Sequence, residues 1–165
     1  MPFNLGVDEL GVKAVKYIEK FKKELLGSMG ENVRSIIVFG SRVEDRWKPW
    51  SDIDVLIVLK EAPKGIERFK SIPYVPSIQP WIYTEKELLK AIREFDIAVL
   101  DALEIGIVIY DDGFWINAKR IFDKFKEEWE LVKVNDGWIS KKIQRERLRQ
   151  RMFKSLSENS LNNST

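Results

Sequence analysis

Two apolar runs separated by a polar connection constrain the fold of this chain more than any other feature. Residues 33–39 and 53–59 are dominated by Ile, Val, Leu and Phe. Runs this short and this apolar are typical of strands that are buried on both faces of a sheet. The first run ends at a Gly-Ser-Arg sequence (residues 40–42), which we expect to turn into a short helix whose first N–H groups face outward. The second run opens with Asp52 and Asp54, so the two strands predict a glycine-serine turn close to a pair of carboxylates.

These two carboxylates are the first candidates for chemistry. Side chains two residues apart in a strand project from the same face, so Asp52 and Asp54 should point the same way. Like charges placed together in this manner destabilise a sheet unless a ligand binds them. Carboxylate oxygens are preferred ligands of Mg²⁺, Gly40 lets the backbone approach a phosphate closely, and Ser41 offers a hydroxyl and an N–H. A plain turn with two solvated acids is the alternative, and we favour a site for a magnesium-bound nucleotide.

The composition narrows the remaining choices. The chain has 165 residues, which is enough for one domain with a sizeable core. It contains no Cys and no His, which excludes a thiolate nucleophile, a zinc-cysteine site and a histidine acid or base. No apolar run is long enough to span a membrane, and the first residues lack the pattern of a signal peptide. We therefore expect a cytoplasmic protein that is not bound to a membrane and that relies on oxygen ligands and a hard metal ion.

The rest of the chain alternates between helical and extended patterns. Apolar residues recurring at three- and four-residue spacing predict helices over residues 8–29, 84–95, 96–104 and 114–131. Asp8 is expected to cap the first of these or to lie in its first turn, and Thr84 with Glu87 forms a capping box for the second. Strands are predicted over residues 78–83 and 107–110, and Pro80 indicates that the former has a free edge. The sum is an α/β (α+β) fold with a small mixed sheet of about four strands flanked by helices.

The end of the chain is strongly basic. Between Lys141 and Lys154 there are seven basic residues and one acidic residue. We predict a main domain over residues 1–138, whose last six residues form a loop or hairpin arm, a basic helix over 139–156 and a polar, flexible tail over 157–165. A solvated helix is the simplest interpretation of the basic segment, and a surface that binds RNA or an acidic partner is the alternative.

The combination of strand, Gly-Ser turn and Asp-x-Asp resembles the signature of the polymerase-beta-type nucleotidyltransferase superfamily, and especially its minimal nucleotidyltransferases. The matching residues are IIVFGSR…SDIDVLIVL, with YTEKEL and GIVIYDDG further on. The resemblance covers about residues 8–130. It implies a nucleotidyltransferase fold that binds an NTP, with ATP the first choice, together with Mg²⁺. It also implies transfer of the nucleotidyl group to an acceptor hydroxyl with release of pyrophosphate.

The resemblance also implies roles for individual residues. Asp52 and Asp54 would be catalytic metal ligands. The nucleotide would be bound by Gly40, Ser41, Arg42 and Ser51, although a surface role for Arg42 is an equal alternative. Three tryptophans, Trp47, Trp50 and Trp81, could stack on the base. Packing is the favoured role for Trp81, whereas both roles stay open for Trp47 and Trp50.

The chain departs from the family pattern at one position. The family has a third carboxylate on the strand that matches residues 78–83, five residues before the threonine that starts the next helix. That position is Gln79 here, and a neutral amide is a poorer ligand for Mg²⁺ and a poorer base than a carboxylate. The alternative is therefore a weak or inactive member that binds a nucleotide or a partner. The resemblance further implies a helical HEPN-domain partner in a toxin–antitoxin module, and a second copy of this chain is another partner that the sequence leaves open.

Overall fold

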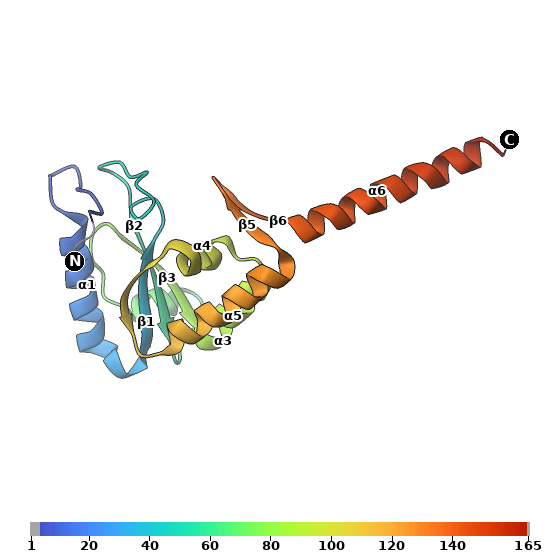
Figure 1. The fold of residues 1–165 in the computed structure, drawn as a ribbon. Helices are drawn as coiled ribbons and strands as arrows, with labels where there is room; N and C mark the ends of the chain where they lie inside the picture. Colours follow the sequence, from blue (N-terminus) through green and yellow to red (C-terminus); the bar gives the residue numbers. More distant parts are fainter. Residues whose placement is uncertain (1–3, 165) are drawn as a thin grey trace. The chain divides into compact units, whose positions relative to one another are not determined.

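The computed structural model describes residues 4–164 and divides the chain into two compact units, one up to Phe122 and one from Asp123 (Figure 1). In chain order the elements are α1 (Ala14–Met29), η1 (Gly30–Asn32), β1 (Val33–Phe39), β2 (Ile53–Leu59), α2 (Ile66–Lys70), β3 (Ile78–Thr84), α3 (Glu85–Arg93), α4 (Ile97–Ile105), β4 (Ile107–Asp111), α5 (Phe114–Trp129), β5 (Leu131–Val134), β6 (Gly137–Ser140) and α6 (Lys141–Asn162). None of these helices is both long enough and apolar enough to cross a bilayer.

The first unit is built on a four-stranded sheet with the strand order β3-β2-β1-β4. Strand β1 is antiparallel to β2 and to β4, whereas β2 and β3 are parallel, so the sheet is mixed as predicted. Strand β3 lies at an edge of the sheet, where the missing N–H of Pro80 costs no ladder hydrogen bond. The predicted fold class, a small mixed sheet of four strands flanked by helices, is therefore confirmed.

Helices cover both faces of this sheet (Figure 1). On one face, Phe21 and Leu25 of α1 belong to a buried cluster with Ile36, Val38 and Val55 of the two central strands. The alternate residues of these strands, such as Ile37, project from the other face of the sheet, toward the helices that follow β3. Both central strands are buried almost throughout, which explains their nearly continuous apolar sequences.

Helix α1 begins later than predicted. It starts at Ala14, and the carboxylate of Asp8 instead accepts hydrogen bonds from the backbone of Leu10 and Val12 and from the hydroxyl of Tyr17. Both predicted roles of Asp8, as a helix cap and as an acid of the first turn, are therefore wrong, because its hydrogen bonds close a tight loop before the helix. Leu10, which lies within the range predicted to be helical, is 86% exposed.

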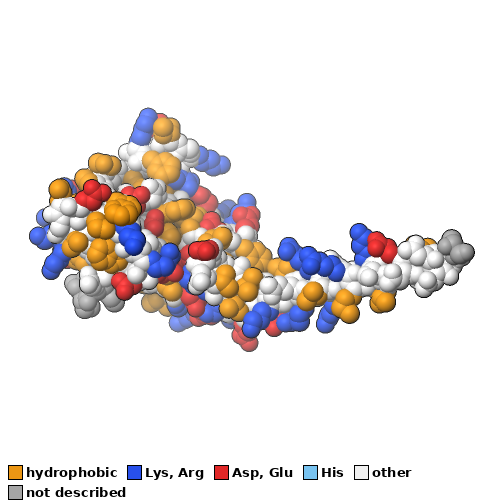
Figure 2. Space-filling view, turned by 90° about the horizontal axis from the view of Figure 1, so that it is seen from above, with side chains coloured by type: hydrophobic (Ala, Val, Ile, Leu, Met, Phe, Trp, Pro, Cys, Tyr) orange, Lys and Arg blue, Asp and Glu red, His pale blue; other side chains and the backbone are white. Residues whose placement is uncertain are grey.

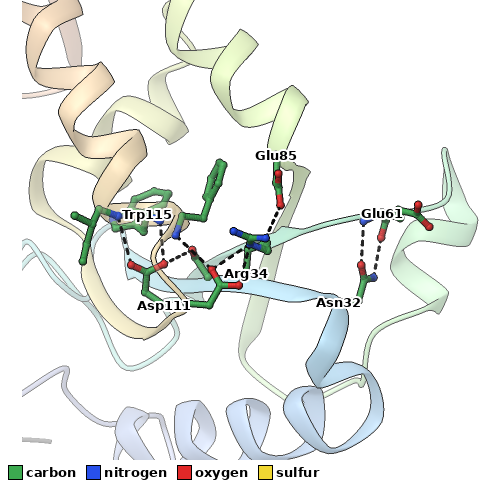
Figure 3. A network of polar contacts seen from close by, with 10 residues as sticks. Asn32, Arg34, Glu61, Glu85, Asp111 and Trp115 are labelled. Atoms are coloured by element: carbon green, nitrogen blue, oxygen red, sulfur yellow. Dashed lines mark hydrogen bonds and ion pairs between the residues drawn. The ribbon is translucent and has the colours of Figure 1, made fainter.

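Polar networks hold the ends of the other elements. The hydroxyl of Thr84 accepts a hydrogen bond from the backbone N–H of Glu87, which confirms the predicted cap of α3. Asp111 accepts hydrogen bonds from the hydroxyl of Ser35 and from the backbone N–H of Trp115, and so connects β1 to the start of α5 (Figure 3). Next to it, Arg34 forms ion pairs with Asp112 and with Glu85 of α3.

The second unit contains the end of α5, the β5–β6 hairpin and α6. The antiparallel pairing of β5 with β6 selects the hairpin alternative for the residues before the basic helix. The hydroxyl of Ser140 accepts a hydrogen bond from the backbone N–H of Ile143, which caps α6. The helix continues to Asn162, six residues beyond the predicted end, over residues that we expected to be a flexible tail. An i,i+4 pair between Lys154 and Glu158 supports this extra length.

Two glycines provide a test of packing in the first unit. A Cβ on Gly106 would lie 2.1 Å from the carbonyl oxygen of Ala102 and 2.5 Å from Ile37 Cγ2, whereas a Cβ on Gly27 would meet nothing within 4 Å. We predict that Gly106→Ala lowers the free energy of unfolding by about 1–3 kcal/mol, because the core must shift. Gly27→Ala, inside α1, should raise it by about 0.5–1 kcal/mol. Urea denaturation measures both, and equal effects of the two changes would contradict this packing.

Candidate functional site

The acid pair lies at the start of β2. Asp54 is the second residue of this strand and is half-buried, whereas Asp52 lies just before the strand and is exposed. Burial raises the pKa of Asp54 above its usual value, the hydrogen bond from Trp81 acts in the opposite direction, and the charge of Asp52 adds to the increase. A cation bound between the two carboxylates would offset both the burial and the mutual repulsion.

Gly40 lies directly against the side chain of Asp54. Its φ is +83°, and a Cβ built on it would lie 2.2 Å from Asp54 Oδ2. Any other residue would therefore meet both backbone strain and a direct clash. The structure thus brings together the predicted turn and the predicted carboxylate.

The chain after Gly40 is a turn, and the short helix predicted there is wrong. Residues 41–45 form consecutive turns in which the N–H groups of Val43 and Glu44 both point at the carbonyl of Gly40. Ser41 lies at the start of this turn, directly after Gly40, which contacts Asp54. A bound phosphate would therefore meet a turn rather than the N-terminus of a helix.

Arg42 is buried, so the surface position that was one alternative for it is wrong. Its side chain is 2% exposed, and its guanidinium donates hydrogen bonds to the carbonyls of Leu5, Val7 and Ser51. The guanidinium carbon also lies 5.2 Å from the centre of a ring of Trp47. Arg42 therefore connects the N-terminal loop to the segment that carries Asp52, and its donors serve these carbonyls instead of standing free for a phosphate.

Ser51 and the two loop tryptophans differ in exposure. The hydroxyl of Ser51 accepts a hydrogen bond from the backbone N–H of Lys48 at 2.8 Å, which closes a tight turn just before Asp52. Trp47 packs on Arg42, whereas Trp50 is 70% exposed. Of the two tryptophans whose role the sequence left open, only Trp50 therefore presents most of its ring to solvent.

Gln79 lies beside the acid pair on the neighbouring strand. In the parallel register of β2 and β3 it is the direct partner of Asp54, and it is exposed. Paired residues of adjacent strands project from the same face, so the amide lies on the carboxylate side. The position where the resemblance implies a third carboxylate is thus next to Asp54.

Trp81 is a residue whose contribution was not predicted from the sequence. Its indole Nε1–H donates a hydrogen bond to Asp54 Oδ1 at 3.0 Å. Its ring packs edge-to-face on Phe39, with 5.9 Å between the ring centres. For Trp81 the sequence favoured packing over stacking on a base, and its position two residues after Gln79 on one face of β3 was the signal available for a contact with Asp54.

A small cavity opens beside Asp52. Its volume is about 230 Å³, and it is lined by residues 8–10, residues 49–52 and Ser77. Three of these residues are acidic, and the exposed side chains of Leu10 and Trp50 stand beside them. The wall next to Asp52 is therefore both negatively charged and apolar.

The carboxylates of Asp52 and Asp54 suit a hard cation whose remaining ligands are waters or substrate oxygens. Among residues 4–164, no three acidic side chains converge in a way that could hold a metal ion. Two carboxylates alone suit Mg²⁺, which usually keeps several waters and binds one or two carboxylates together with substrate phosphates. Asp52 and Asp54 are therefore the residues that would hold this ion.

Known proteins are similar to this chain in sequence. The family model described as nucleotidyltransferase domain matches residues 15–156. A Methanocaldococcus jannaschii protein named "Putative protein adenylyltransferase MJ1305" is 28% identical over 138 residues, covering 70% of this chain and 92% of that protein. A second protein from the same organism, named "Putative protein adenylyltransferase MJ0141", is 31% identical over 80 residues, covering 44% of this chain and 81% of that protein.

Solved structures are similar at lower identity. The crystal structure of a protein described as "putative nucleotidyltransferase" from Sulfolobus solfataricus is 17% identical with a TM-score of 0.41, covering 59% of this chain and 80% of that chain. A crystal structure of the toxin–antitoxin MntA–HepT contains a chain that is 14% identical with a TM-score of 0.43, covering 70% of this chain and 92% of that chain.

The contact between Gly40 and Asp54 can be tested with a matched pair of glycines. Gly11 has a φ of +77°, close to that of Gly40, but a Cβ on it would meet nothing within 4 Å. We predict that Gly11→Ala lowers the free energy of unfolding by about 1–2 kcal/mol through backbone strain alone. Gly40→Ala should lower it further, because the Asp54 carboxylate must also move. Equal losses in urea denaturation would show that the carboxylate does not lie against this turn.

Proposed function

The chain belongs to the nucleotidyltransferase domain family, and we propose that it binds a magnesium-bound NTP and transfers the nucleotidyl group to an acceptor hydroxyl, releasing pyrophosphate. The observation that carries this proposal is the contact of Gly40 with Asp54, which joins the turn to the acid pair. The names of the two archaeal relatives favour ATP as the donor and a protein side chain as the acceptor.

In this proposal each part of the site has its own task. Asp52 and Asp54 hold Mg²⁺, which supplies positive charge to the triphosphate when it is bound. Gly40 lets the backbone approach the phosphates, and Ser41 contributes its hydroxyl and N–H. Arg42 positions the connection that carries Asp52, through its hydrogen bonds to backbone carbonyls.

We expect nucleotidyl transfer to be slow because of Gln79. A neutral amide beside Asp54 is a poor base for the acceptor hydroxyl and a weak ligand for a cation. The protein should therefore bind the nucleotide more readily than it turns it over. Our second proposal is therefore a weakly active or inactive member of the family that acts through nucleotide or partner binding.

We predict that calorimetry detects binding of ATP with Mg²⁺ to the parent protein. Asp52→Asn and Asp54→Asn should each weaken it at least about tenfold, since loss of even an indirect metal contact costs 10- to 100-fold. Asp45→Asn, at an exposed acid of the same connection, is the control and should bind as the parent does. Absence of binding by the parent would refute the nucleotide site. Labelled ATP with protein acceptors then measures transfer, which should increase in Gln79→Asp if the missing carboxylate limits the rate.

The second proposal rests on α6. Leu148, Met152 and Leu156 recur every four residues along this helix and are all more than half exposed. Basic and hydrophobic side chains lie together along the helix (Figure 2). A surface that is both apolar and positively charged suits an acidic protein partner better than a purely polar helix would. We propose that a helical partner, such as the HEPN-domain protein of a toxin–antitoxin pair, docks here, with RNA as the alternative ligand.

The charge on α6 can be tested directly. We predict that Arg147→Glu/Arg151→Glu weakens binding of a fluorescent polyglutamate peptide at least tenfold, and that added salt weakens binding to the parent. Lys20→Glu/Lys23→Glu on α1 makes the same change in net charge and is the control. Fluorescence anisotropy measures both, with a labelled single-stranded RNA in parallel. Equal losses in the two variants would refute α6 as the binding surface, and binding of the RNA alone would select RNA.

A further inference from the structure

The two oxygens of the Asp54 carboxylate have different surroundings. Oδ1 accepts the hydrogen bond from Trp81 Nε1 at 3.0 Å, on the side of the edge strand β3. Oδ2 lies against Gly40, at the turn that follows β1. The orientation of the carboxylate is therefore fixed from both sides before any ligand binds.

Trp81 is itself held in place. It is the register partner of Leu56 in β2, and its ring packs on Phe39, which stands opposite Asp54 in β1. Phe39 is buried, whereas Trp81 is 38% exposed, so the indole has one supported side and one side toward solvent. An indole N–H is a donor only, and so it can neither bind a cation through this nitrogen nor act as a base.

The same strand carries the residue that departs from the family pattern. Gln79 and Trp81 are two residues apart on β3 and so project from one face, which is the face of Asp54. A pair of metal ions about 3.5–4 Å apart needs a carboxylate oxygen for each ion. Here one lone pair of Asp54 Oδ1 already accepts the hydrogen bond of the indole, and Gln79 offers only a neutral amide.

Building on the proposed function, we propose that Trp81 is a positioning residue that directs Asp54 Oδ2, together with Asp52, toward a single divalent cation. Each chain would then hold one protein-bound cation rather than a pair. The hydrogen bond to Trp81 turns Oδ1 toward the indole and so keeps Oδ2 at the turn where the phosphates would lie.

Binding of Mn²⁺ alone tests this proposal without relying on turnover. Electron paramagnetic resonance of free Mn²⁺ gives both the number of ions bound and their dissociation constant. We expect one ion per parent chain and an approximately tenfold higher dissociation constant for Trp81→Phe, which keeps an aromatic ring on Phe39 but removes the N–H. Trp138→Phe is the control and should bind as the parent does.

The possible results separate this proposal from the function it builds on. If the parent binds Mn²⁺ but Trp81→Phe binds it equally well, or if the parent binds two ions, the positioning role is refuted while the nucleotide site stands. If the parent binds neither Mn²⁺ nor ATP with Mg²⁺, the proposed function itself fails.

A measurement on the parent alone covers the case in which Trp81→Phe does not fold. In a nitrogen-15 correlation spectrum, the indole N–H of Trp81 can be identified through its contacts with Phe39. We expect substoichiometric Mn²⁺ to broaden this signal strongly. A signal that stays sharp while Mn²⁺ binds would overturn the proposal.

Discussion

The half-buried carboxylate of Asp54 is the interaction on which the rest of the site depends. A charged group that loses water is costly unless other groups stabilise it, and here burial raises its pKa. The indole of Trp81 stabilises one oxygen, and the absence of a side chain on Gly40 leaves room for the other. Three strands therefore contribute to one carboxylate: β1 through the turn that follows it, β2 through Asp54 and β3 through Trp81. A bound cation would offset the remaining cost of burying this charge.

Arg42 organises the loops around this carboxylate. Its guanidinium is withdrawn from water, and such a group is tolerated only when its donors are well paired. Here the carbonyls of Leu5, Val7 and Ser51 provide those partners. The N-terminal loop and the connection between β1 and β2 have little regular structure of their own. The buried guanidinium of Arg42 thus gives both loops a fixed position next to Asp52.

The sheet and the position of Asp54 beside the turn were predictable because they follow from local patterns. Apolar runs placed β1 and β2, and Pro80 placed β3 at an edge, whereas the common side of Asp52 and Asp54 stays a prediction from the period of two. The roles of Arg42 and Trp81 depend on contacts between distant segments, which no local period encodes. Arginine is rarely fully buried, and neither alternative given for Arg42, a phosphate contact or a surface role, included burial. The start of α1 was misplaced because Asp8 has the chemistry of a cap but uses it to close a loop.

The central claim is that the turn after β1 and the acid pair of β2 together form one site for a nucleotide and a metal ion. A crystal structure with Mn²⁺ and a non-hydrolysable ATP analogue tests it most directly, because anomalous scattering locates Mn²⁺ independently of the protein. We predict one anomalous peak that contacts Asp52 and Asp54 Oδ2, with the triphosphate against Gly40 and Ser41. A nucleotide bound elsewhere, or a metal ion that contacts neither carboxylate, would contradict this account.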